Sequence, residues 1–162
     1  MSVLGNRPDL FPDSPYVNRY YHTQYEKYEI PPEALADEQF AAIIKEAEKY
    51  LGYPYVWGGS SPDTSFDCSG FVSYVYNHCG LHWSFGRLGA EGLRGMCAYV
   101  SPESARPGDL IFFEKTYDTA GASHVGIYVG NNRMLHCGDP IHYASIDTSY
   151  WRSHFLQFGR LP

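Results

Sequence analysis

The chain has 162 residues, of which 44% are hydrophobic, so it can build one domain with its own core. Its net charge of −6 and pI near 5.6 argue against nucleic-acid binding, which needs a basic patch or stripe. No apolar run approaches the roughly 18–20 residues that cross a bilayer, and we find no secretion signal. We therefore expect no nucleic-acid partner and no membrane contact from this chain.

The first 37 residues differ in composition and periodicity from the rest of the chain. Pro8, Pro12 and Pro15 precede the tyrosine-rich run "VNRYYHTQYEKYEI", which shows neither helical nor strand periodicity. We predict an arm or linker over residues 1–37 and a domain over 38–162. The alternative for the tyrosine-rich run is a binding strip for sugar or peptide.

Two amphipathic helices are predicted after this arm. The first covers residues 37–52, with Asp37 as its N-cap and Gly52 as its stop. The second begins near Cys68 and ends at Gly80, after the turn-rich run "GGSSPDTS". Apolar residues recur at helical spacing in both segments.

The rest of the chain reads mainly as strands. Residues 81–107 lack a clear period and are predicted to be a loop with a short helix near 90–96. The runs "DLIFF", "HVGIYVG", "RMLHCG" and "FLQFGRL" are short β-type segments separated by turn residues. This order predicts an α+β fold, with N-terminal helices packed on a C-terminal antiparallel sheet.

The four cysteines are predicted to be free thiols. They are Cys68, Cys79, Cys97 and Cys137, at irregular spacing. Cys68 and Cys79 belong to one predicted helix, where eleven residues rise about 16 Å. That distance is too long for a disulfide between them.

Cys68 is the strongest candidate for a nucleophile. The thiolate is the reactive form, and a helix N-terminus stabilises it through unpaired N–H groups and a partial positive charge. The same N–H groups can hold the oxyanion of an acyl-transfer intermediate. We therefore expect the Cys68 pKa to lie below its free value, and Asp67 to cap the helix or bind a cationic group. The alternative is a half-buried cysteine that starts a helix for packing reasons.

A cysteine nucleophile needs a histidine base and a third group that orients it. Of seven histidines, only His124 and His136 lie within strand-like runs. A three-residue loop at 130–132 would pair Val129 with Arg133 and place both histidines on one face of a hairpin. A two-residue loop would place them on opposite faces.

A zinc site is the competing chemistry for the same three side chains. Cys68, His124 and His136 form an acceptable ligand set with an open fourth position. The ligands lack short spacing, however, and no glutamate base lies near them in the sequence. We therefore expect no metal and no other cofactor.

Five motifs together resemble one family. "PYVWGG", "DCSGFVSYVY", "RPGDLIFF", "SHVGIYVG" and "MLHCG" occur in the order and spacing of NlpC-type peptidases, which are papain-like enzymes that cut peptidoglycan stem peptides. The resemblance covers residues 38–160. The run "GDPIHYASIDTSYWRSHF" is most similar to the peptidase halves of wall hydrolases encoded on conjugative elements.

This resemblance implies roles for individual residues. It implies Cys68 as nucleophile, His124 as general base and His136 as the residue that orients the base. It also implies that Tyr55 helps to hold the oxyanion. The positions implied to contact substrate are Asp67, Ser69, Arg87 and Ser123. Gly89 replaces a residue that is usually serine or threonine in the family, so contacts in this loop depart from the common pattern.

The implied activity is hydrolysis of the bond between γ-D-glutamate and lysine or diaminopimelate, through a Cys-His-His triad and a thioester. The alternative is an acyl transferase, amidotransferase or binding relative on the same fold. We expect a monomer that is secreted or wall-associated and belongs to a longer exported protein. Cytoplasmic muropeptide recycling is the alternative location.

Overall fold

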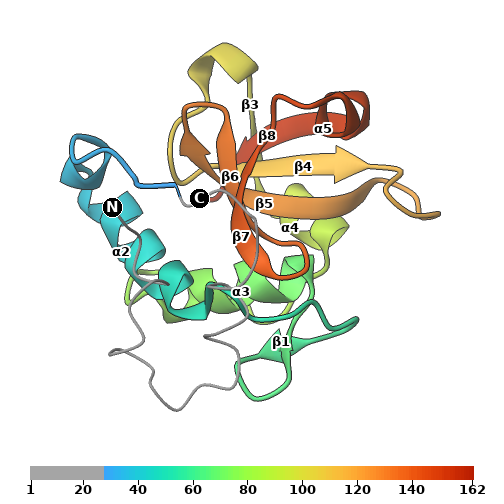
Figure 1. The fold of residues 1–162 in the computed structure, drawn as a ribbon, viewed down its shortest axis with the longest axis horizontal. Coiled ribbons are helices and arrows are strands. Elements are labelled where there is room, and N and C mark those ends of the chain that lie inside the picture. The colour runs from blue at the N-terminus through green and yellow to red at the C-terminus, as the bar shows by residue number, and fades with distance from the viewer. Residues whose placement is uncertain (1–27) are drawn as a thin grey trace.

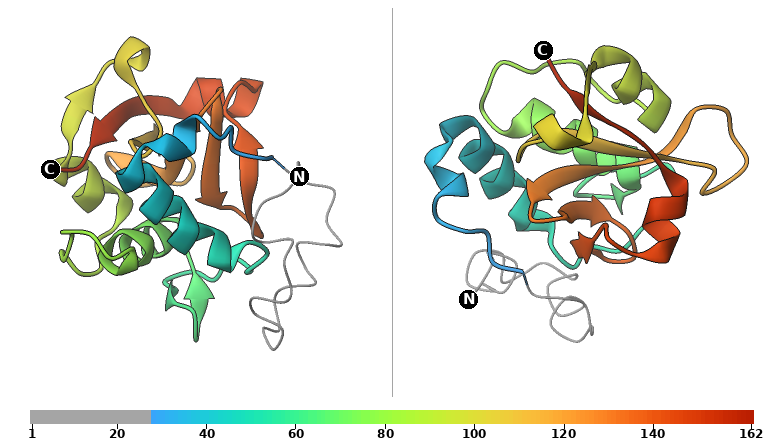
Figure 2. Two further views of the ribbon diagram at one scale, coloured as in Figure 1. Left: turned by 90° about the vertical axis from the view of Figure 1, so that its left-hand side faces the viewer. Right: turned by 90° about the horizontal axis from the view of Figure 1, so that it is seen from above.

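The computed structural model describes residues 28–162, in which α2, α3 and α4 cover one face of a six-stranded antiparallel sheet and the short α5 packs on the other (Figures 1 and 2). The helices are α2 (Glu38–Ala47), α3 (Cys68–His78), α4 (Ala90–Met96) and α5 (Ser149–His154), with 3-10 turns at Ala34–Ala36, Glu48–Tyr50 and Pro102–Ser104. The sheet contains, in spatial order, β3 (Ala98–Val100), β8 (Phe155–Arg160), β4 (Leu110–Glu114), β5 (Ala122–Gly130), β6 (Arg133–Cys137) and β7 (Ile141–Ser145). A separate hairpin is formed by β1 (Ser60–Ser61) and β2 (Ser65–Phe66). The predicted α+β fold is confirmed.

Both long helices begin where the sequence predicts, but α2 ends at Ala47, five residues before the predicted stop, and continues as the 3-10 turn Glu48–Tyr50. Asp37 caps α2 by accepting hydrogen bonds from two backbone N–H groups at 3.0 and 3.2 Å. Asp67 caps α3, which starts at Cys68. Gly52 follows that 3-10 turn and Gly80 follows α3, with φ of 91° and 88°, a conformation that glycine adopts at little cost. No helix in the described part of the chain has the length and apolar character needed to cross a membrane.

The two faces of β5 have different neighbours. Val125, Ile127 and Val129 are at most 1% exposed and join the core formed with α2 and α3. His124 alternates onto the opposite face, where α5 packs through Trp151. One strand thus supplies the core on one side and the predicted base on the other.

The turn between β5 and β6 differs from the prediction. Arg133 pairs with Gly130 rather than with Val129, and the register shifts just before Gly130. The turn consists of residues 131–132, which have positive φ of 52° and 56°. The predicted three-residue loop is therefore wrong: a two-residue turn is combined with a β-bulge that adds one residue to β5.

The bulge restores the predicted alternation along the strands. Tyr128 pairs with Met134 in the structure, as the three-residue loop would also have required. Because one extra residue shifts the side-chain alternation by one position, it offsets the effect of the shorter turn. His124 and His136 consequently share a face.

The strands β3 and β7, helix α5 and the short β1–β2 hairpin were not predicted. β7 and α5 lie within residues 139–154, where polar and aromatic residues alternate without a sustained period. α5 is six residues long, too short for helical periodicity to identify it. These elements depend on the sheet against which they pack.

Residues 28–37 pack against the domain. The ring of Tyr28 meets that of Tyr143 at 5.4 Å, and Ile30 is only 7% exposed. A domain boundary after residue 37 remains a prediction. Most of the tyrosine-rich run proposed as a binding strip falls within residues 1–27, outside the described residues.

Candidate active site

The predicted nucleophile, Cys68, lies in the first turn of α3 and is 7% exposed. Asp67 caps this turn through Oδ1, which accepts a backbone N–H at 2.7 Å. The backbone N–H groups of Val125 and Ser69 hydrogen-bond to the sulfur. Val125 directly follows His124 on β5, so the thiol lies beside the strand that carries the predicted base.

The two predicted histidines contact each other directly. His124 Nε2 and His136 Nδ1 are 2.8 Å apart, and the ring planes are nearly perpendicular, at 81°. Because Nε2 of His124 is engaged, Nδ1 is the nitrogen available to a neighbouring thiol. For Nδ1 to accept a proton, Nε2–H must donate to His136, which must accept through Nδ1. This hydrogen bond therefore selects the tautomer that a general base requires.

Burial sets the protonation states of the resting site. It raises the pKa of the Cys68 thiol to about 11, although the N–H groups of Val125 and Ser69 act in the opposite direction. It lowers the pKa of His124 to about 4. The predicted lowering of the thiol pKa is therefore wrong, because desolvation outweighs the helix N-terminus. The resting site contains a neutral thiol and a neutral imidazole.

Aromatic side chains surround the histidine pair. Trp151 from α5 stacks on His124 at 5.1 Å and 27°, and meets the edge of His136 at 5.5 Å. His142 from β7 approaches His136 at 4.9 Å, and its Nδ1 donates to the carbonyl of Pro140 at 2.6 Å. Trp151 and His142 could not be predicted as neighbours, since both lie in elements without a sustained sequence pattern.

Asp67 has two roles at once. Besides capping α3, it accepts a hydrogen bond at 2.8 Å from Nη2 of Arg87. Arg87 also donates from Nη1 to the hydroxyl of Ser69 at 2.8 Å. The predicted cap is confirmed, and the cationic partner of Asp67 in this structure is Arg87. A substrate ammonium at this position would share the carboxylate with the guanidinium.

The predicted site residues other than the two histidines line one cavity of about 200 Å³. Its lining comprises Tyr55, Trp57, Asp67, Cys68, Ser69, Arg87, Gly89, Ala90, Tyr117 and Ser123. Trp57 and Tyr117 are 71% and 48% exposed, and their rings meet at 5.3 Å. These two residues form an aromatic rim that the analysis of the sequence did not identify. Trp57 lies within the "PYVWGG" motif, which is the only signal that could have suggested it.

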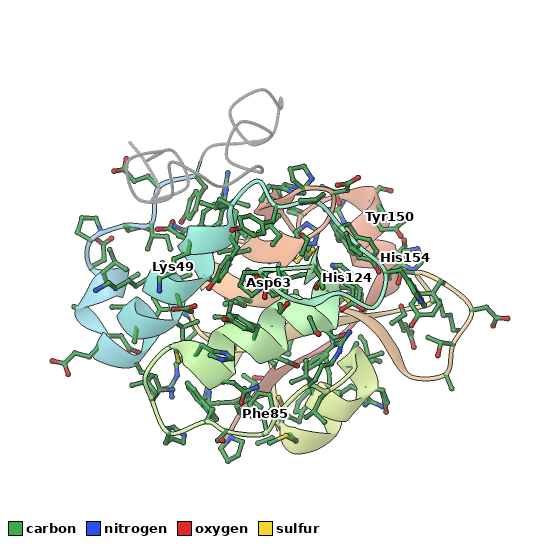
Figure 3. All side chains as sticks on the ribbon, turned by 90° about the horizontal axis from the view of Figure 1, so that it is seen from below. Lys49, Asp63, Phe85, His124, Tyr150 and His154 are labelled. Atoms are coloured by element: carbon green, nitrogen blue, oxygen red, sulfur yellow. The ribbon has the colours of Figure 1, made fainter. Side chains whose placement is uncertain are left out.

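His124 and His136 do not line this cavity and belong to β5 and β6 of the sheet. In Figure 3, His124 lies between one end of α3 and helix α5, which carries Tyr150 and His154. Cys68 lines the cavity, and the backbone of Val125, the residue after His124 on β5, lies beside its sulfur.

Tyr55 is suited to donate a hydrogen bond. Burial is the main cause that raises its pKa, and the nearby Cys68 and Asp67 add to the effect. The phenol consequently keeps its proton at neutral pH. The backbone N–H of Tyr55 donates to Oδ1 of Asp139 at 3.1 Å, which ties this segment to the loop before β7.

Ser123 occupies the cavity wall but is only 3% exposed. Its hydroxyl oxygen accepts the backbone N–H of Thr116 at 2.9 Å and lies 2.5 Å from the Thr116 hydroxyl. These bonds hold the segment after β4 against the start of β5. A substrate contact by Ser123 remains a prediction, and its hydroxyl is already engaged within the chain.

The metal alternative gains no support from the geometry. Within residues 28–162, no group of three or more His, Cys, Asp or Glu side chains is arranged to hold a metal ion. His124 Nε2 and His136 Nδ1 face each other, so their lone pairs do not converge on a common point. All four cysteines are free thiols, as predicted.

The motifs, the fold and the site agree with one protein family. The sequence of this chain matches the family model of the NlpC/P60 family over residues 52–160. The chain belongs to the NlpC/P60 family. A solved NlpC/P60 structure from Staphylococcus aureus, described as similar to a lipoprotein, aligns with a TM-score of 0.72 and 39% identity, covering 90% of this chain and 46% of that one.

Curated NlpC/P60 relatives include two Bacillus subtilis proteins. The bifunctional muramidase/DL-endopeptidase CwlT is 43% identical over 129 residues, covering 75% of this chain and 36% of that protein. The gamma-DL-glutamyl hydrolase is 39% identical over 121 residues, covering 73% of this chain and 28% of that protein. The chain thus spans about a third of these relatives.

Proposed function

We propose that this chain is a cysteine endopeptidase that hydrolyses peptidoglycan stem peptides between γ-D-glutamate and the diamino acid. The observation that carries the proposal is the 2.8 Å bond between His124 and His136, which leaves Nδ1 of His124 for the thiol of Cys68. The names of the relatives, DL-endopeptidase and gamma-DL-glutamyl hydrolase, support the same bond type.

In the acylation step, Nδ1 of His124 takes the thiol proton as the sulfur of Cys68 attacks the γ-carbonyl carbon. Because thiol and imidazole are both neutral at rest, proton transfer accompanies the attack. The oxyanion is held by N–H groups of the first turn of α3 and by the phenol of Tyr55. The imidazolium then protonates the amine of the diamino acid, which leaves, and a thioester remains on Cys68.

In the deacylation step, water replaces the amine. Nδ1 of His124 takes a proton from the water as its oxygen attacks the thioester carbon. The carbon–sulfur bond breaks, the free γ-carboxyl product forms, and the proton returns to Cys68. His136 keeps the same His124 nitrogen directed at the sulfur throughout both steps.

We further propose that the chain acts as a monomer at the cell wall, with no metal or cofactor. A free stem peptide or one attached to glycan supplies the scissile bond. The acidic net charge of −6 does not oppose this substrate, which is small and needs no steering by a basic surface.

The test uses a synthetic stem peptide and mass spectrometry of its products. Wild-type protein should release the dipeptide that ends in γ-D-glutamate, and Cys68→Ala should lose hydrolysis while keeping the wild-type circular dichroism spectrum. Cleavage at another bond would refute the stated specificity.

Three other thiols provide matched controls. Cys79→Ser, Cys97→Ser and Cys137→Ser should each keep substantial activity, provided that the variant is folded. Hydrolysis by Cys68→Ala at the wild-type rate would exclude the cysteine mechanism.

A further inference from the structure

A second and larger hollow adjoins the active-site cavity. It has a volume of about 470 Å³ and is lined by Ser60, Ser73, Tyr74, Asn77, His78, Ser84, Gly86 and Arg87. Arg87 also lines the active-site cavity, so the two hollows meet at this side chain. In Figure 3, α3 runs between the loop with Asp63 and the loop with Phe85, and the hollow lies along this helix.

Side chains of α3 fix the outer wall of this hollow. The hydroxyl of Ser73 donates to the carbonyl of Leu88 at 3.2 Å and accepts its N–H at 3.1 Å. The amide of Asn77 accepts the N–H of Phe85 at 2.8 Å and donates to the carbonyl of Gly86 at 2.7 Å. Four hydrogen bonds thus hold the 85–88 loop at a set distance from the helix, and the hollow is built before a ligand arrives.

The chemistry of the lining suits a sugar. Tyr74 and His78 line the hollow and stack face to face at 3.8 Å and 18°, so a ligand can pack on an outer face of this pair. The hydroxyls of Ser60 and Ser84 and the guanidinium of Arg87 supply hydrogen-bonding groups around it. Flat aromatic faces pack against the C–H face of a pyranose ring, and hydroxyl, amide and guanidinium groups bond its polar substituents.

The direction of the substrate follows from the reaction. His124 must protonate the leaving amine, so the diamino acid lies on the His124 side of Cys68. The acyl part, γ-D-glutamate preceded by L-alanine, then extends past Ser69 and Arg87. Two extended residues span roughly 7 Å, and Ser73 lies about 7.5 Å along α3 from Cys68 at the helical rise. Whatever is attached to L-alanine therefore reaches the hollow.

We propose that this hollow binds the N-acetylmuramyl sugar that is joined through its lactyl group to the L-alanine of the stem. The inference rests on the proposed function and adds the substrate class: stems still attached to glycan, in preference to free stem peptides. An outer face of the stacked Tyr74–His78 pair contacts the sugar ring, and Arg87 lies where the lactyl group passes from one hollow to the other.

The experiment compares two substrates that differ only in the sugar. One is the stem tetrapeptide with a free N-terminal alanine, and the other carries N-acetylmuramic acid on that alanine. Wild-type kcat/KM should be at least about tenfold higher for the muramyl-linked substrate, the discrimination that one well-fitted group supplies.

Two variants locate the preference in the hollow. Ser84→Trp fills it from an exposed position, and His78→Ala removes one ring of the stacked pair. Each should bring the ratio of the two kcat/KM values toward one. Ser104→Trp is the matched control, since Ser104 is an exposed serine in the 3-10 turn before β4, and it should keep the wild-type ratio.

The outcomes separate this inference from the proposed function. Equal kcat/KM values of the wild type on both substrates, or a faster reaction with the free peptide, would overturn the inference and leave the endopeptidase proposal intact. A wild-type ratio in Ser84→Trp and His78→Ala would also overturn it. Failure of the wild type to cleave either substrate would refute the proposed function, and the inference with it.

Discussion

The residue that orients His124 is itself a histidine, and this choice has an electrostatic consequence. Burial, and then the neighbouring His124 and His142, lower the pKa of His136, so it is neutral at pH 7. A carboxylate in the same place would favour the imidazolium of His124 and raise its pKa. A neutral partner orients the ring without adding charge. The resting pair of neutral thiol and neutral imidazole is consistent with this arrangement.

The two histidines should respond differently to substitution. His124→Gln should be nearly inactive, since general acid–base steps contribute roughly 10²–10⁴-fold. His136→Gln and His136→Asn should retain measurable activity, because an amide oxygen can accept the Nε2–H of His124. His136→Ala should fall between these cases. The measurement is the rate of dipeptide release by each folded variant, and higher activity in His124→Gln than in His136→Gln would reverse the assigned roles.

Trp151 should act on the reaction through the histidines that it contacts. Trp151→Leu removes the ring stacked on His124, so kcat should fall by roughly 10- to 10²-fold, as for other losses of alignment, with little change in KM. Tyr150→Leu is the control on the same helix, since the Tyr150 ring contacts Trp151 and His154 instead. A change in KM alone would assign Trp151 to substrate binding.

At the level of elements, apolar periodicity predicted those helices and strands whose formation depends on local sequence. The N-caps of α2 and α3 could be read from single residues, and the four apolar strands from a pattern that repeats over a full element, whereas the end of α2 at Ala47 was missed. The bulge at Gly130 could not be read, because it depends on how two strands pair. The bridge from Arg87 to Asp67 joins residues 20 positions apart, and no local pattern specifies it.

Gly70 shows how closely two elements approach beside the thiol. A Cβ at Gly70 would lie 2.0 Å from the backbone oxygen of Gly59, which no side-chain movement can relieve. Gly70→Ala should therefore lower the free energy of unfolding by about 1–3 kcal/mol, measured by urea denaturation. Gly95→Ala in α4 meets nothing within 4 Å and should be neutral or stabilising. Equal stability of the two variants would contradict this packing argument.

At the scale of the whole molecule, the active site requires several polar side chains to be buried, which lowers the stability of the fold. His124, His136 and His142 all have pKa values lowered mainly by burial. His136 is 3% exposed, and its Nε2 has no hydrogen-bond partner among the described residues. The family resemblance predicted that the first two of these histidines act together. Their uncharged state depends on the surrounding core, which only the complete fold defines.

These buried histidines should make the stability of the molecule depend on pH above the range of its carboxylates. A histidine whose folded pKa is lowered binds fewer protons than in the unfolded chain, so its contribution is complete above about pH 6.5 and is lost as pH falls toward the folded pKa. For His124, whose pKa falls from 6.5 to about 4, the loss reaches up to about 3 kcal/mol. The Glu91 carboxylate, whose pKa is lowered by its bond to Arg94, acts only below about 4.5.

Urea denaturation between pH values of about 4.5 and 7 tests this dependence. The free energy of unfolding of the wild type should fall steadily as the pH is lowered through this window, because the unfolded chain takes up protons that the folded one excludes. His136→Gln should show a shallower slope, since glutamine does not titrate. A wild-type stability that is constant down to about pH 4.5 would show that these histidines are not buried in the neutral form.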